Sequence, residues 1–169
     1  MNRKFVIEAV LLAIYGQLLM PSRKVEYIIP YSTILELHDI HYSGESVMPD
    51  EEEDFHVKQK IADLITFLEE SLNKKKIERA LLAPWRISAP LLVNTKTSLM
   101  IVFAEEKGQF GDVFDPIETE LILTSQREES PILTDQIELI ERIFQEGIDT
   151  QVYDIEDFDF ALEDTIIKL

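Results

Sequence analysis

The uninterrupted apolar run from Leu99 to Phe103 is the feature that most constrains the fold of this chain. It lacks the alternation of polar and apolar residues that marks a half-exposed strand, so it is typical of a strand covered on both faces. Residues 90–93 and 98–104 flank Asn94-Thr95-Lys96-Thr97, which predicts a β-hairpin around this strand. The sequence therefore predicts a β-sheet with other elements packed over it.

The clearest helix signal begins at Asp50, which precedes four acidic residues and has Glu53 three positions on, as in a capping box. Lys74, Lys75 and Lys76 close the segment, so acids at its start and bases at its end both complement the helix dipole. Between these ends, apolar residues recur with a helical period. They are Val57, Ile61, Leu64, Ile65, Leu68 and Leu72.

Residues 3–20 are apolar around most of a helical circumference, which predicts a helix in the core or in a subunit interface. The interface alternative predicts a homodimer through this helix. Glu8 interrupts the run, which is shorter than the ~20 predominantly apolar residues of a membrane span. No small-x-small cleavage site follows it, as a signal peptide would need. We therefore predict no membrane association.

The remaining segments give shorter signals. Residues 32–40 fit either a strand or a short helix, and both alternatives stay open. Gly147 is well placed to follow the end of a helix. The other predicted elements are strands at Val25–Ile29, Glu118–Ser125 and Gln151–Ile155 and a helix from Thr134 to about Glu146.

Together these elements predict an α+β fold, with an antiparallel or mixed sheet packed against about three helices. A length of 169 residues fits a single domain over residues 1–169. An acidic segment at about residues 149–169 mixes carboxylates with apolar side chains. We expect this segment to dock on the body of the protein or on a partner.

The charge is concentrated in the second part of the chain. Residues 1–99 hold 12 Lys and Arg against 14 Asp and Glu, whereas residues 100–169 hold 4 against 19. This polarity argues against nucleic acid as a direct ligand and favours a basic protein partner. Tryptophan and arginine are enriched at interface hot spots. The candidate interaction residues are Trp85, Arg86, Asp154, Glu156, Asp157, Asp159, Glu163 and Asp164.

The chain contains no cysteine, which excludes disulfides, cysteine zinc sites and thiol nucleophiles. This composition fits a reducing compartment, and we predict a cytoplasmic location. The sequence also lacks the glycine-rich phosphate loop, the dinucleotide-binding fingerprint and the nucleophile elbow. We therefore expect no cofactor.

All three histidines fall between residues 38 and 56, so His38, Asp39, His41 and His56 form a candidate metal site for hydrolysis. Their spacing matches no metal-binding motif, and surface positions are the simpler interpretation. The acidic segment does not fit a calcium-binding EF-hand loop, because Leu162 stands where glycine is required.

Asp112 and Asp115 are paired loop carboxylates of the kind that can carry acid–base chemistry. No motif fixes a reaction, so three functions stay open. The first is a non-catalytic interaction or regulatory module with an acidic docking surface. The alternative is a metal-dependent hydrolase that uses the histidine cluster. The third is an inhibitor that mimics nucleic acid through its acidic surface.

Overall fold

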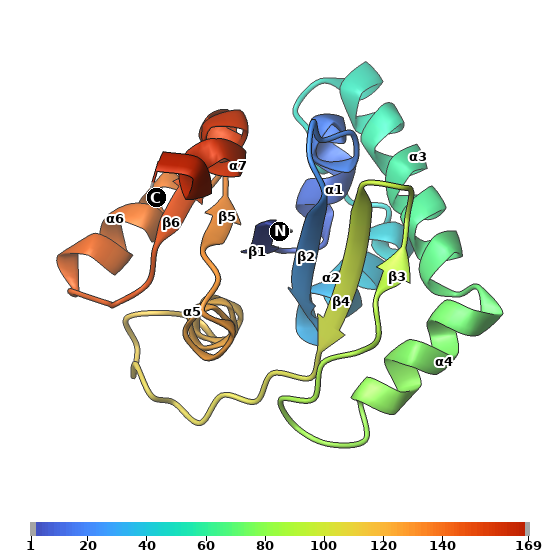
Figure 1. Ribbon diagram of the computed structural model, residues 1–169. Coiled ribbons are helices and arrows are strands. Elements are labelled where there is room, and N and C mark those ends of the chain that lie inside the picture. The colour runs from blue at the N-terminus through green and yellow to red at the C-terminus, as the bar shows by residue number, and fades with distance from the viewer. Residues whose placement is uncertain (1–2, 168–169) are drawn as a thin grey trace.

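A six-stranded mixed sheet forms the middle layer of the molecule (Figure 1). The protein is described from a computed structural model covering residues 3–167, with side chains described through Glu163. The strands are β1 (Arg3–Val6), β2 (Val25–Pro30), β3 (Leu91–Leu92), β4 (Thr97–Val102), β5 (Ile132–Thr134) and β6 (Val152–Asp154).

The strands lie in the order β3-β4-β2-β1-β5-β6. β1 pairs in parallel with β2 and β5, β2 with β4, and β5 with β6, whereas β3 runs antiparallel to β4. A mixed sheet, one of the two predicted alternatives, is therefore confirmed. Because helices connect its parallel strands, the molecule is a single compact α/β domain, and the α+β prediction is corrected in this respect.

Residues 3–167 form seven α-helices, more than the three predicted. The difference arises because parallel strands need crossover connections, which antiparallel hairpins do not. No helix in this range is long and apolar enough to cross a membrane. The helices are α1 (Val10–Ile14), α2 (Tyr31–Ser43), α3 (Glu51–Leu68), α4 (Ser71–Ala80), α5 (Pro116–Glu128), α6 (Ile137–Gln145) and α7 (Phe158–Ile167).

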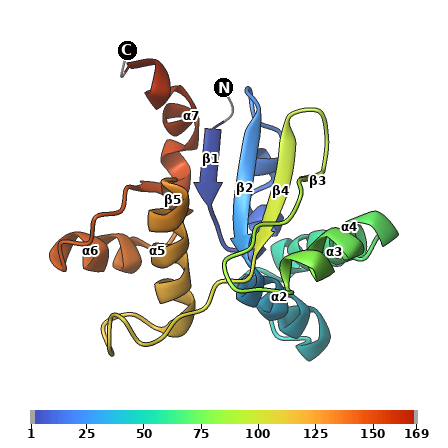
Figure 2. The same cartoon turned by 60° about the horizontal axis from the view of Figure 1, so that its bottom comes forward.

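Each face of the sheet has its own core. Phe5, Tyr27 and Leu99 point into the first core, where α1 to α4 and α7 pack. Neighbouring strand residues such as Ile28 and Met100 point into the second core, under α5 and α6. Figures 1 and 2 show α3 and α4 on one side of β2 and β4, with α5 and α6 on the other. This arrangement explains why β4 is buried along its whole length, as its apolar run predicts.

The predicted helix at residues 3–20 is wrong. The segment holds the central strand β1, then α1 and a short 3-10 turn at Gly16–Leu19. Phe5 and Val6 are fully buried on opposite faces of the sheet, so no alternation of polarity marked the strand. The homodimer predicted through this segment stays a prediction, without the exposed helix on which it rested.

The predicted strand at Glu118–Ser125 is also wrong, because α5 covers these residues. The Asp115 side chain accepts a hydrogen bond from the Glu118 N–H, and the Glu118 side chain accepts one from the Asp115 N–H. Pro116 occupies the first position of the helix, where its missing N–H costs nothing. These local start signals outweigh the weak alternation of Leu121 and Leu123.

Three other predictions are confirmed. Val25–Ile29 lies within β2, the 90–104 hairpin is formed by β3 and β4, and Asp50 caps α3 by accepting a hydrogen bond from Glu53. Residues 32–40, which were ambiguous, lie within α2. Elements with caps or flanking turns were thus predictable from local sequence.

Candidate functional site

The strand order identifies one edge of the sheet as the place to look for a ligand site. From β1 the chain moves outward through β2 and β4, and then returns to add β5 and β6 on the other side of β1. The order therefore reverses between β1 and β5. In open α/β sheets, ligands bind at such a point, beyond the carboxyl ends of the strands. The residues that directly follow β1 and β5 are Ile7, Glu8, Asp135 and Gln136.

Glu8 lies at this point and is only 8% exposed. Its Oε1 accepts a hydrogen bond from Gln136 Nε2 at 3.2 Å. Burial raises its pKa to about 7, because the charged form loses hydration. The charges of four carboxylates from other elements contribute to this raised pKa after burial: Glu36, Asp135, Asp115 and Glu118. Glu8 is therefore poised to exchange a proton near neutral pH.

Local hydrogen bonds bring Glu36 close to the end of β1. The Ala9 N–H donates to Thr33 Oγ1 at 3.2 Å, and this hydroxyl donates to the Pro30 carbonyl. These bonds place the first turn of α2 beside Glu8, with Glu36 three residues after Thr33. Burial raises the pKa of Glu36, and nearby carboxylate charges add to the shift.

Asp135 follows β5 and is held by a tyrosine from the opposite side of the switch point. The Tyr15 hydroxyl donates to Asp135 Oδ2 at 2.8 Å. Burial raises the pKa of Tyr15 to about 12, and the hydrogen bond and charge of Asp135 contribute. The tyrosine therefore remains a donor at all physiological pH values and orients this carboxylate.

Glu120 extends the acidic group along α5. The Ser32 hydroxyl donates to Glu120 Oε2 and opposes the upward shift of its pKa. Burial is the largest cause of that upward shift, and the charges of Glu106 and Glu36 add to it. The acidic group thus spans the ends of β1 and β5, the first half of α2 and the start of α5.

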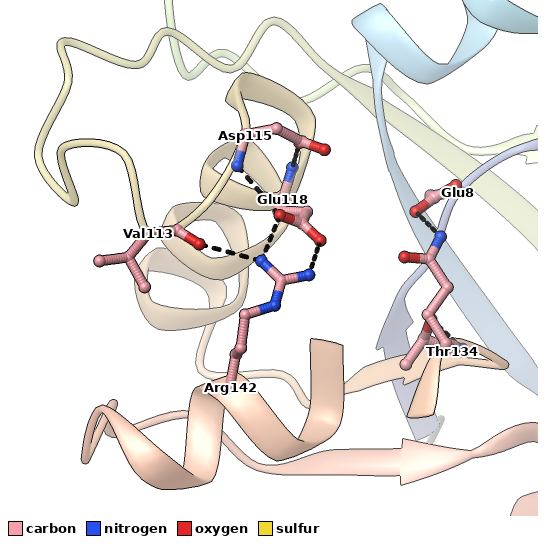
Figure 3. A network of polar contacts seen from close by, with 7 residues as sticks. Glu8, Val113, Asp115, Glu118, Thr134 and Arg142 are labelled. Carbon is pink, nitrogen blue, oxygen red and sulfur yellow. Dashed lines mark hydrogen bonds and ion pairs between the residues drawn. The ribbon is translucent and has the colours of Figure 1, made fainter. Parts of the chain in front are cut away.

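Arg142 neutralises one member of this group. Its guanidinium donates two hydrogen bonds to Glu118, at 2.8 and 2.5 Å, and one to the Val113 carbonyl at 2.9 Å (Figure 3). This pairing lowers the pKa of Glu118. Among the described residues, no Lys, Arg or His forms an ion pair with Glu8, Glu36 or Asp135. Among the described residues these three carboxylates, like Asp115 and Glu120, therefore lack a basic partner.

Two hollows flank the carboxylates. One of about 500 Å³ lies between residues 106–113, the start of α5 and Arg142. Another of about 380 Å³ is lined by Glu36, Asp39, Ile40 and Ser43 of α2 and by Glu45. A small ligand therefore has room beside the acidic group. Within the described residues, no group of three or more His, Asp or Glu side chains is placed so that it could hold a metal ion.

The predicted histidine site remains without geometric support. His38 and His41 lie on α2, where both rings contact Tyr42, and His41 is exposed. His56 lies on α3, exposed, with its ring against Phe55. Asp39 is exposed on α2. The histidine metal site stays a prediction and is not developed further.

The predicted interaction residues occupy two separate places. Trp85 is half-buried beside the second core, with the Arg127 guanidinium 4.4 Å from its ring centroid, and Arg86 is exposed. Asp154 ends β6 and accepts a hydrogen bond from the Glu156 N–H. Asp157, Asp159 and Glu163 are exposed with Glu156, and the side chain of Asp164 lies outside the described residues. Their role in docking stays a prediction.

Sequence reasoning missed Glu8 and Asp135 as site residues. Each stands one or two residues after a buried strand, which is the usual signal for a ligand-binding side chain in an α/β sheet. Glu8 was noticed only as an interruption of an apolar run assigned to a helix. Once β1 is assigned correctly, the same interruption marks the carboxyl end of the central strand.

The comparisons with known proteins bear on the fold alone. No family model and no curated protein matches the sequence. A solved structure, described as a domain of a functionally unknown protein from Methanocaldococcus jannaschii DSM 2661, is similar with a TM-score of 0.50. The two share 13% identity, and the similarity covers 90% of this chain and 91% of the other. This likeness supports the α/β architecture.

Proposed function

We propose that this protein is a divalent-cation-dependent hydrolase of phosphate esters, with Glu8, Glu36 and Asp135 as the cation-binding carboxylates. The observation that carries the proposal is that the charges of Glu36 and Asp135 act on the buried Glu8, which follows the central strand at the switch point of the sheet. None of the three has a basic partner among the described residues. This proposal keeps the metal-dependent hydrolase that the sequence analysis gave as the alternative function. It places the metal site on these carboxylates and not on the histidines.

A cation is proposed because the charges need compensation. Carboxylates packed together raise one another's pKa values, as the shift of Glu8 illustrates. Two remedies exist, which are proton uptake and the binding of a hard cation that prefers oxygen ligands. At neutral pH a cation in the millimolar range competes well with a proton on a group of pKa about 7.

Mg²⁺ and Mn²⁺ fit this site better than zinc. Mg²⁺ is usually bound through one or two carboxylates, several waters and the phosphate of the substrate, and it needs no closed protein cage. Within the described residues no three His, Asp or Glu side chains could hold a metal ion as they are arranged, so the proposed site forms only when a cation draws the carboxylates together. Zinc prefers nitrogen and sulfur ligands, and the chain has no cysteine.

The proposed reaction follows from this arrangement. Glu8, Glu36 and Asp135 would hold the cation, which would act as a Lewis acid on a phosphate oxygen and lower the pKa of a bound water. A carboxylate that does not ligate the cation would accept the proton of this water as the water oxygen bonds to phosphorus. The ester P–O bond would break, and the same carboxyl group would return the proton to the departing oxygen. The hollow beside Asp115 and Glu118 has room for the rest of the substrate.

The test combines metal binding with hydrolysis. Chelator-treated protein is titrated with Mn²⁺ and Mg²⁺ by calorimetry, and then assayed on bis(p-nitrophenyl) phosphate and on single-stranded RNA and DNA. We expect one strong cation site and hydrolysis that needs the cation. Glu8→Gln and Asp135→Asn abolish both, whereas Asp159→Asn, which changes an exposed acid on α7, leaves both unchanged. Protein that binds neither cation at 10 mM would refute the proposal.

The polymeric substrates also test the expectation that nucleic acid is not a direct ligand. A net charge of −17 repels a polyanion, so we expect the small diester to be the better substrate per phosphate group. The non-catalytic interaction module and the cytoplasmic location both stay predictions. The module would be the remaining function if every phosphate ester were left intact in the presence of a bound cation.

A further inference from the structure

The outer face of α6 carries large apolar side chains that the chain itself leaves uncovered. Phe144 is 86% exposed and Ile137 is 61% exposed, and they share a stripe with half-buried Ile140. The adjacent stripe of the helix, Leu139 and Ile143, is buried in the second core. α6 therefore has two apolar stripes, of which one is buried in the second core and the other is largely exposed.

A groove continues this exposed stripe. It has a volume of about 470 Å³ and runs from α6 across the following turn to the edge strand β6. Its apolar lining comes from Ile140, Ile143, Phe144, Ile148 and Val152. A connected apolar surface next to a hollow is a feature of interaction sites, whereas single exposed apolar residues are ordinary.

The charge around the groove selects the occupant. Residues 137–152, which contain the groove, hold four Asp and Glu and a single base, Arg142, whose guanidinium is already bound to Glu118. Glu141 lies on α6 between Ile137 and Phe144, and Asp149 lines the groove. Because both copies would bring the same acidic rim, a second copy of the chain is repelled here. A segment with basic residues beside an apolar stripe is attracted.

The form of that segment follows from the edge of the sheet. β6 has only three residues, which is too short for an added strand to gain many main-chain hydrogen bonds. An amphipathic helix instead uses its apolar stripe and needs no free edge. We infer that the α6–β6 groove is a docking site for a basic amphipathic helix of a partner protein.

The docking site lies apart from the acids named earlier as the interaction surface. The earlier candidates at Asp154, Glu156, Asp157, Asp159 and Glu163 sit on the acidic segment, and Phe144 was not among them. The two surfaces share acidic character, but an apolar anchor is present in the groove itself. The anchor provides affinity that salt does not screen, whereas the rim acids mainly raise the association rate.

The experiment uses the full chain and a synthetic 18-residue peptide, labelled with fluorescein, that carries leucine at helical i, i+3, i+4 and i+7 spacing and lysine elsewhere. Binding is followed by fluorescence anisotropy at 50 and 300 mM salt. We expect Phe144→Ser to weaken binding at least tenfold at both salt concentrations. Phe160→Ser, which changes a 57% exposed phenylalanine on α7, is the matched control and changes binding less than twofold.

Further arms separate the apolar and ionic contributions. Glu141→Gln should weaken binding two- to threefold at 50 mM salt and have no effect at 300 mM. A peptide of the same composition with its leucines scrambled off the stripe should bind at least tenfold more weakly. Equal binding of the scrambled peptide, or of the Phe144→Ser protein, would overturn the proposal.

Light scattering on the free protein tests whether a second copy of the chain occupies the groove. A wild-type dimer that Phe144→Ser converts to a monomer would mean that a second copy covers the groove, and would also overturn the proposal. Because Phe144 is exposed, we expect the variant to keep the wild-type circular dichroism spectrum and melting temperature.

Discussion

Glu8 and Glu118 are two buried glutamates in one site, and their environments are opposite. Their exposed fractions are 8% and 6%. Glu118 accepts two hydrogen bonds from Arg142 and lies at the first turn of α5, and its pKa is lowered. Among the described residues, Glu8 accepts a hydrogen bond only from the amide of Gln136, and its pKa rises to about 7.

The comparison teaches which part of the site serves stability and which part serves binding. A buried carboxylate paired with a bidentate arginine stabilises the fold, and here the pair of Glu118 and Arg142 links α5 to α6. A buried carboxylate surrounded by like charges destabilises the folded state, and is retained where a ligand relieves the repulsion. Burial alone therefore does not separate the two roles, whereas the sign of the surrounding charge does.

The largest effect should come from breaking the ion pair between Arg142 and Glu118. Arg142→Met leaves Glu118 buried without its partner, and we expect a loss of about 3 kcal/mol of unfolding free energy, at the low end for buried pairs. Arg142 is about one-third exposed, which limits the loss. Urea unfolding at pH 7 measures it. The double variant Arg142→Met/Glu118→Gln should recover part of the loss, and an equally unstable double variant would contradict the role of the charge.

The second prediction concerns Glu8, the buried glutamate without a basic partner among the described residues. Glu8→Gln removes the repulsion, so in chelator at pH 8 we expect it to stabilise the fold by about 2 kcal/mol. The ceiling is about 3.4 kcal/mol, because the pKa rises from 4.5 to about 7 and each pKa unit is worth about 1.4 kcal/mol. The gain should shrink at lower pH and vanish below about pH 4.5, where Glu8 is protonated in both states. Thermal unfolding from pH 4 to 8 measures it.

The sign of this pH dependence follows from linkage. The pKa of Glu8 is raised in the folded state, so between pH 4.5 and 7 the folded state binds more protons than the unfolded state. Wild-type stability attributable to Glu8 therefore falls as the pH rises through this window. If the difference in unfolding free energy between the wild type and Glu8→Gln stayed constant with pH, the raised pKa of Glu8 would be contradicted.

The third prediction adds the cation. At a concentration ten times its dissociation constant, Mn²⁺ should stabilise the wild type by about 1.4 kcal/mol at pH 7. The melting temperature with and without Mn²⁺ measures this effect. Glu8→Gln should gain much less, and Asp159→Asn should gain as much as the wild type. Equal stabilisation of all three proteins would locate the cation elsewhere.

The smallest effect tests the orientation of Asp135. Tyr15→Phe removes the hydrogen bond to Asp135, which should cost about 1 kcal/mol of stability. We also expect weaker binding of Mn²⁺, because the carboxylate is no longer held in one rotamer. Calorimetry and urea unfolding measure the two effects. Tyr42→Phe, which changes a 73% exposed tyrosine, is the control and should change neither.

Local signals predicted some elements and missed others for a physical reason. β2, the β3–β4 hairpin and the start of α3 have caps or turns whose chemistry acts within a few residues. β1 lies at the centre of the sheet and is buried on both faces, so its composition resembles that of a buried helix. α5 was assigned as a strand although Asp115, Pro116 and Glu118 mark a helix start, and this signal was available in the sequence.

The sequence by itself determined the covered strand at β4, the helix cap at Asp50 and the polarity of charge along the chain, because each depends on neighbouring residues or on composition. Only the tertiary structure decided which carboxylates meet. Glu8, Glu36 and Asp135 come from distant parts of the chain and carry no shared motif. They lie together because parallel strands end at the same edge of a sheet, and the order of those strands is set by packing on both of its faces.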